Sequence, residues 1–165
     1  MSAYATFLRL VHIFSAIFWV GTTLFMVGFL EPVIKAAGAE GGKMMQRLIS
    51  GTRFSLIIAI AGWATVLSGL LMYWQMTAFD IALMFTARLP LTLGAVAGIA
   101  AGVVGGAVQG RASGQLAMLG QQIAAQNGPP SAAQSARMSA LQTTIQRGSR
   151  LSAILMVLAV IGMVV

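Results

Sequence analysis

The chain has 165 residues, of which 58% are hydrophobic and only 8% are charged, whereas soluble domains carry about 25% charged residues. Its formal charge is +7, but the basic residues lie mostly between apolar segments, which is typical of membrane proteins and argues against nucleic-acid binding. The chain has no cysteine, which excludes disulfides, thiolate metal sites and cysteine nucleophiles.

These features predict a single all-α transmembrane domain over residues 1–165, folded as an integral membrane four-helix bundle. A membrane-spanning helix needs about 20 mainly apolar residues. The chain has four runs that suit this length, and we place the spans at about 4–30, 54–76, 90–110 and 145–165.

The first span is interrupted by only two strongly polar residues, Arg9 and His12. A polar connection from Glu31 to Arg53 leads to the second span. After that span, residues 77–89 are expected to form a helical turn in the membrane interface. Pro90 then opens the third span within its first turn, where a missing N–H is tolerated.

Glycine recurs at every fourth position of the third span, at Gly94, Gly98, Gly102, Gly106 and Gly110. Small residues at this spacing let another helix backbone approach closely, which is how helices associate in lipid. This glycine stripe predicts tight packing against a neighbouring span of the same chain. A seam between protomers and a groove for a flat cofactor are the two other interpretations.

The segment between the third and fourth spans is polar, and its Asn-Gly-Pro-Pro sequence at 127–130 predicts a helix stop and a turn. Apolar residues fall on one stripe before this break and on another after it. The stripes are Leu116, Leu119 and Ile123, and Met138, Leu141 and Ile145. We therefore predict an antiparallel helical hairpin that continues spans three and four into the cytoplasm.

The distribution of basic residues predicts the orientation of the chain. Of the ten Lys and Arg residues, eight lie in the connections that follow spans one and three, and only Arg9 and Arg88 lie on the other side. The positive-inside rule then places both termini outside and both long connections in the cytoplasm. We expect the chain in the inner membrane of the cell.

His12 is the only histidine, and an ionisable residue at membrane depth is a functional candidate by default. At about 100° per residue, His12, Ser15, Trp19 and Met26 share one side of the first helix, and Arg9 lies at its outer edge. A neutral imidazole hydrogen-bonded to another helix, a ligand of haem iron or copper, and a proton relay are the three interpretations of His12.

Imidazole suits haem iron and copper equally, whereas methionine favours Cu(I) or a His/Met haem. With one histidine, haem would need a methionine ligand, five-coordination or the histidine of a second protomer. Met72 and Met76 form the only Met-x-x-x-Met step within a span and are candidate ligands. Their alternative role is packing, as we expect for Met156 and Met163.

Arg9 and Arg88 are expected near the outer surface, on the same side as Asp80. They could extend to the surface and pair with Asp80, or hold anionic groups such as haem propionates. The sequence contains no recognisable hydrolytic triad, phosphate loop or paired intramembrane carboxylate, so no reaction follows from these residues.

Four segments carry a resemblance to the copper resistance protein D superfamily of small membrane proteins, over roughly residues 8–71. They are Leu10–Ile13, Trp19–Gly21, Arg53–Ser55 and Gly69. Longer relatives are associated with copper uptake, and the distantly similar four-span protoporphyrinogen oxidases bind haem through a histidine in the first span. The resemblance implies that His12 carries the metal. It does not extend to a methionine near Thr52 or to a soluble copper-binding domain.

We therefore expect a membrane protein that binds b-type haem through His12 in a redox-associated, electron-transfer role, with Arg9, Ser15, Trp19 and Arg88 around the cofactor. A copper-handling protein and a non-catalytic subunit of a larger membrane complex are the alternatives. The expected partners are the lipid bilayer and further protein subunits, either copies of this chain or members of a larger complex.

Overall fold

The computed structural model describes residues 2–126 and 128–165, and every regular element within these ranges is a helix. Four helical stretches are long and apolar enough to cross a membrane. They are Ala3–Ala36, Phe54–Thr77, Leu89–Ala125 and Ala132–Val164. An all-α chain with four helices of spanning length is what the sequence predicts.

The first helical stretch extends beyond its predicted end near Leu30. It consists of α1 (Ala3–Phe25), a π-helical turn η1 (Met26–Leu30) and α2 (Glu31–Ala36). The Glu31 N–H bonds to the Met26 carbonyl, five residues back, directly before Pro32. Because Pro32 has no N–H for the α-helical ladder, a wider turn at this point lets the helix continue past the proline.

The predicted polar connection is helical too. Gly38 adopts a positive φ of 56°, which turns the chain between α2 and the next helix, α3 (Gly38–Ser50). The α2 and α3 helices pack together, and Gly41 is buried against the backbone of Ile34, where an added Cβ would overlap the Ile34 carbonyl. The second long helix, α4 (Phe54–Thr77), follows.

A short helix, α5 (Ile81–Phe85), occupies the segment in which the sequence predicts a helical turn. The Asp80 carboxylate caps it by accepting a hydrogen bond from the Leu83 N–H at 3.2 Å. Pro90 is the second residue of α6 (Leu89–Val103), in the first turn as predicted.

The third helical stretch passes through a second π-helical turn, η2 (Val104–Gly110), into α7 (Arg111–Ala125). The chain then returns as α8 (Ala132–Val164), which packs along α7. Ser131 and Gln134 cap the start of α8 reciprocally, through bonds of 3.2 and 2.8 Å. The predicted antiparallel hairpin is therefore present, although Asn127 at its tip lies outside the described residues.

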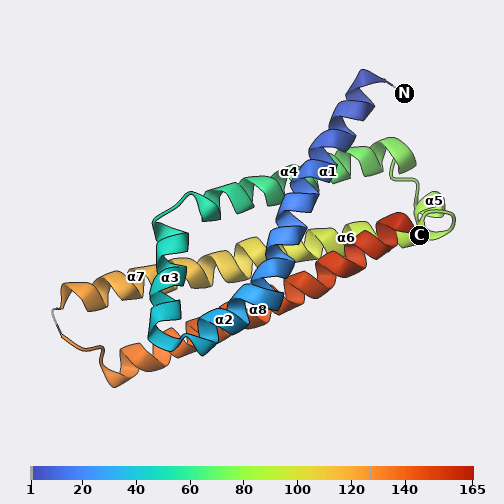
Figure 1. Cartoon of the computed structure of the whole chain (residues 1–165). Coiled ribbons are helices and arrows are strands. Elements are labelled where there is room, and N and C mark those ends of the chain that lie inside the picture. The colour runs from blue at the N-terminus through green and yellow to red at the C-terminus, as the bar shows by residue number, and fades with distance from the viewer. Residues whose placement is uncertain (1, 127) are drawn as a thin grey trace.

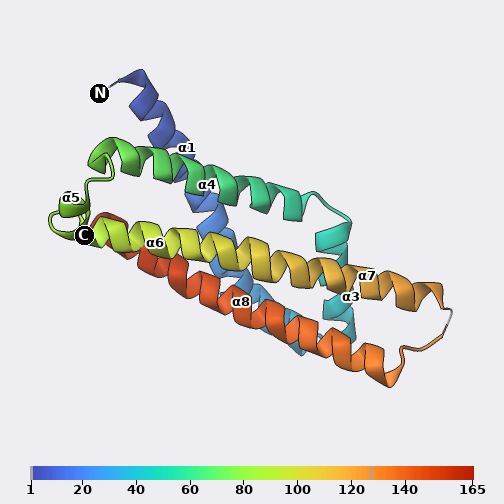
Figure 2. The ribbon, with the colours of Figure 1, turned by 180° about the vertical axis from the view of Figure 1, so that it is seen from behind.

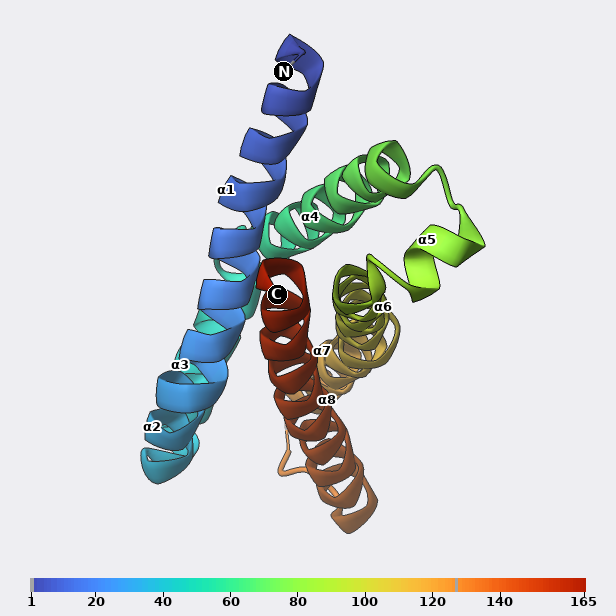
Figure 3. The same cartoon turned by 90° about the vertical axis from the view of Figure 1, so that its right-hand side faces the viewer.

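The long helices pack chiefly as two pairs, α6 with α8 and α1 with α4 (Figure 1). Viewed from behind, α6 and α8 run side by side, and α4 lies above them (Figure 2). The α1 helix crosses the others obliquely, and its N-terminal end extends beyond them (Figure 3).

All four stretches meet at one small core, to which each contributes one buried residue. These residues are Trp19 from α1, Ala61 from α4, Ala101 from α6 and Met156 from α8. One large aromatic ring and one flexible thioether thus fill the space between two alanine-bearing helices. Most large apolar side chains elsewhere on the four long stretches are exposed.

The glycine stripe of α6 packs against more than one helix. A Cβ on Gly94 would lie 2.9 Å from the Ala159 carbonyl oxygen of α8, whereas one on Gly102 would touch Val66 and Trp19. A Cβ on Gly106 would meet nothing within 4 Å. The contacts change because four residues advance about 400°, so each step turns the stripe by about 40°. Gly94, Gly98 and Gly102 therefore serve packing within the chain.

Candidate functional site

Polar residues of α1 and α4 meet where the two helices pack together. The α1 helix places His12, Ser15 and Trp19 on one face, at i, i+3 and i+7. The facing side of α4 carries small and hydroxyl-bearing residues, among them Gly62, Thr65, Ser68 and Gly69. Because these side chains are small, the two backbones approach closely and the polar groups of α1 reach α4. We call His12, Ser15, Thr65, Ser68 and Gly69 the His12 cluster.

His12 is held by the backbone of α4. Its Nδ1 lies 2.9 Å from the Thr65 carbonyl oxygen and 3.3 Å from Ser68 Oγ. A carbonyl oxygen can only accept a hydrogen bond, so Nδ1 carries the proton and donates a hydrogen bond to the Thr65 carbonyl. In the neutral ring, the lone pair is then on Nε2, which makes no hydrogen bond within the described residues and is not completely buried among them.

The imidazole of His12 lies directly against Gly69. A Cβ at this position would lie 2.8 Å from Cε1 and 3.1 Å from Nδ1 of His12. Both distances are shorter than ordinary van der Waals contacts, so any larger residue would displace the ring. Glycine is therefore needed here for the close approach of the imidazole to α4.

The hydroxyl groups beside His12 satisfy one another and the helix backbones. Ser15 Oγ donates to the Val11 carbonyl at 2.6 Å, and Thr65 Oγ1 lies 3.0 Å from Ser15 Oγ and 2.8 Å from the Ala61 carbonyl. Thr65 and Ser68 are buried, and no buried polar side-chain atom among the described residues lacks a partner. Ser15, a predicted site residue, thus belongs to the cluster.

Trp19 lies two turns further along α1 and is 8% exposed. Its indole ring packs against Gly62 of α4 and reaches Gly102 of α6, where added Cβ atoms would lie 3.3 and 3.7 Å away. Together with Met156, this ring fills the centre between the four long helices. Trp19, a predicted site residue, therefore lies between the His12 cluster and the core.

The two predicted arginines lie apart from each other. Arg9 is exposed, one turn before His12 on α1. Arg88 is exposed directly before α6, and within the described residues its side chain forms no hydrogen bond to the His12 cluster. The structure shows no ion pair between Arg88 and Asp80 in the part of the chain it describes, and Asp80 instead caps α5.

Few side chains near His12 could bind a metal together with it. Among residues 2–126 and 128–165, no three His, Cys, Asp or Glu residues gather as a metal site. Met72, one turn beyond Gly69 on α4, is half-buried, and Met76 is exposed. Met156 is 2% exposed and packs in the core as expected, whereas Met163 is 41% exposed and faces outward.

Reasoning from the sequence missed the α4 half of the cluster. The sequence did contain a signal for this half, because Gly62, Thr65 and Gly69 follow the spacing of three and four residues that places them on one helix face.

A second polar cluster was also missed. Gln109, within η2, lies 2.9 Å from Ser152 Oγ and 3.0 Å from Ser149 Oγ, and joins the third stretch to α8.

Comparison with known proteins returned no family model, no curated protein and no solved structure that matches this chain.

Proposed function

We propose that this chain is an integral membrane protein that binds b-type haem through Nε2 of His12, in a redox-associated role. The observation that carries the proposal is the hydrogen bond from His12 Nδ1 to the Thr65 carbonyl. Histidines that ligate metals almost always donate their other ring N–H to a carbonyl, carboxylate or water. This bond orients the ring and leaves the Nε2 lone pair for an external ligand.

The residues present fit one axial ligand of a haem. Trp19 and Met156 fill the centre of the chain, and α8 covers the glycine stripe at Gly94 and Gly98. These contacts leave the α1–α4 crossing, at His12, as the place where the chain could hold a haem. Its second ligand would be a methionine, the His12 of a second copy, or none.

Each residue of the cluster has a defined task in this proposal. Haem, when bound, supplies one-electron chemistry. His12 would hold the iron, the Thr65 carbonyl and Gly69 would orient the imidazole, and Trp19 would separate the site from the core. Arg9, one turn outward and exposed, is placed to pair with propionates near the surface.

Copper handling is the second candidate, and it rests on Met72. This half-buried residue follows Gly69 by three positions, so it lies on the same side of α4 as the residues that hold His12. An imidazole and a thioether are a ligand pair that Cu(I) accepts. The resemblance of residues 8–71 to the copper resistance protein D superfamily supports both candidates.

An absorption spectrum of the purified full chain, followed by metal analysis, distinguishes these functions. The protein is expressed with supplementary haem precursor and, in parallel, with copper. A Soret band with about one haem per chain or per pair of chains is the expected result. Copper without a Soret band would replace haem by the second candidate. Neither cofactor would leave the chain as a non-catalytic subunit of a larger membrane complex.

A further inference from the structure

The helix α3 has two chemically different sides. At about 100° per residue, Met44, Met45, Leu48 and Ile49 occupy one arc, which also contains the buried Gly41. The opposite arc contains Glu40, Lys43, Gln46 and Arg47. Two of the apolar side chains stay exposed, Met44 at 57% and Ile49 at 39%. A helix with an apolar arc and a basic arc is typical of segments that lie in a membrane interface.

The position of α3 agrees with an interfacial location. In Figures 1 and 2, α3 runs steeply across the direction of α4, α6 and α8, whereas a spanning helix would follow them. Charged residues flank it where the long helices become polar. Arg53 lies directly before α4, and Arg150 of α8 pairs with Glu31 of α2 at 3.5 Å. Charges at this level mark the border between hydrocarbon and headgroups.

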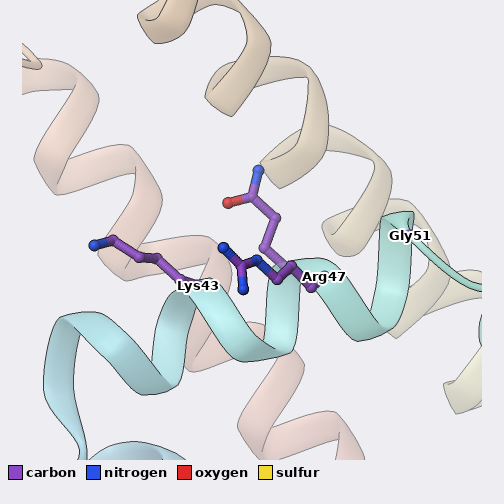
Figure 4. A pocket seen from close by; sticks show the side chains of 4 residues that line it. Lys43, Arg47 and Gly51 are labelled. Carbon is purple, nitrogen blue, oxygen red and sulfur yellow. The ribbon is translucent and has the colours of Figure 1, made fainter.

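The basic arc borders an open cavity of about 320 Å³, lined by Lys43, Gln46, Arg47 and Gly51. Figure 4 shows the side chains of Lys43 and Arg47 extending along the same side of α3. Gly51 follows α3, and a Cβ there would lie 2.6 Å from the Arg47 carbonyl oxygen. The cavity therefore combines an ammonium and a guanidinium beside a residue without a side chain, and these two donors suit phosphate oxygens.

One acidic residue acts against this arrangement. Glu40 accepts a hydrogen bond from Lys43 Nζ at 2.6 Å, and both side chains are largely exposed. Exposed ion pairs contribute little, so a phosphate can compete for the ammonium group. Glu40 is thus a built-in partial competitor, and removing its charge should strengthen anion binding.

We propose that α3 lies in the headgroup layer of the membrane in which the chain is embedded and binds anionic phospholipids, with Lys43 and Arg47 holding the lipid phosphate. The exposed apolar side chains Met44 and Ile49 reach toward the acyl chains. The inference requires the chain to be a membrane protein but does not depend on haem binding at His12.

The test measures lipid preference on the full chain. The protein is reconstituted in vesicles that contain equal amounts of phosphatidylglycerol and phosphatidylcholine, and is then extracted in a mild detergent. Native mass spectrometry counts how many molecules of each lipid stay bound to the chain. The wild type should retain phosphatidylglycerol preferentially. Lys43→Gln and Arg47→Gln should each lower that preference by about fivefold, the effect of one basic residue near an anionic surface. Glu40→Gln should raise it.

The matched control is Arg137→Gln, which removes one positive charge from α8 and leaves α3 intact. This control should keep the wild-type preference. An equal loss in the control would show that only overall charge matters and would overturn the proposal. Displacement of phosphatidylglycerol by excess inorganic phosphate would identify a site for soluble phosphate, and would overturn it as well.

Discussion

At the scale of single residues, the contacts that hold the His12 side chain all come from α4. Its Nδ1 donates to a backbone carbonyl, and its ring rests on Gly69. The sequence singled out His12 because an ionisable residue at membrane depth is rare. It did not identify Thr65 as the acceptor, since a backbone carbonyl leaves no trace in residue type and its position depends on how α4 is rotated against α1.

The Gly69→Ala variant tests this support. The added methyl group would lie 2.8 Å from His12 Cε1, so the ring must tilt and the bond to Thr65 must weaken. We expect haem affinity to fall by about 10–100-fold, as is common when a partner of a metal-ligating histidine is disturbed, with folding retained. Haem titration followed at the Soret band measures it. Gly21→Ala on α1 is the control, because a Cβ there meets nothing within 4 Å and should change nothing.

At the scale of helices, the length and apolar character of the four long stretches follow from composition, and so does the α7–α8 hairpin. What the sequence did not predict was the continuation past Leu30 into α2 and the helical order of α3. The segment was treated only as a polar connection, whereas the amphipathic pattern of Gly38–Ser50 already indicated a helix. The path of the glycine stripe required the crossing geometry, since each four-residue step turns by about 40°.

The backbones of α6 and α8 pack directly against each other at Gly94 and Gly162. A Cβ on Gly162 would lie 2.6 Å from the Pro90 carbonyl oxygen and 2.8 Å from the Gly94 Cα. Because backbone atoms cannot rotate away, Gly162→Ala should lower the free energy of unfolding in detergent by about 1–3 kcal/mol. Circular dichroism during chemical denaturation measures the change. Gly106→Ala, which meets no atom within 4 Å, should stay close to wild type; equal losses in both variants would refute this packing argument.

At the scale of the whole molecule, four apolar helices of spanning length set the architecture, but the oblique crossing of α1 could not be predicted. The length of an apolar run shows that it can span and leaves its tilt open, since tilt is set by packing against neighbours. Here the close contact of α1 with α4 at Gly62 and Gly69 and the wedge of Trp19 at the core set its direction.

The proposed orientation places both termini outside and both long connections in the cytoplasm. Because the chain has no cysteine, single cysteines can be introduced at Gly42, Gly128 and Ala87. Gly42 is chosen over Gly41, where a side chain would overlap the Ile34 backbone. In intact cells, a membrane-impermeant maleimide should label only the Ala87→Cys variant. Labelling of Gly42→Cys and Gly128→Cys to different extents, one accessible and one protected, would contradict four spans.

The most direct test of haem ligation at His12 is the Soret absorbance per chain of His12→Ala beside the wild type, both expressed with sufficient haem precursor. The side chain is half-buried and its loss leaves the Gly94–Gly162 packing untouched, so the variant should fold. We predict that the Soret band disappears in His12→Ala and returns in part when imidazole is added. A variant that keeps the full haem content of the wild type, or a wild type that contains no haem, would contradict the proposal and leave His12 as a hydrogen-bonded packing residue between α1 and α4.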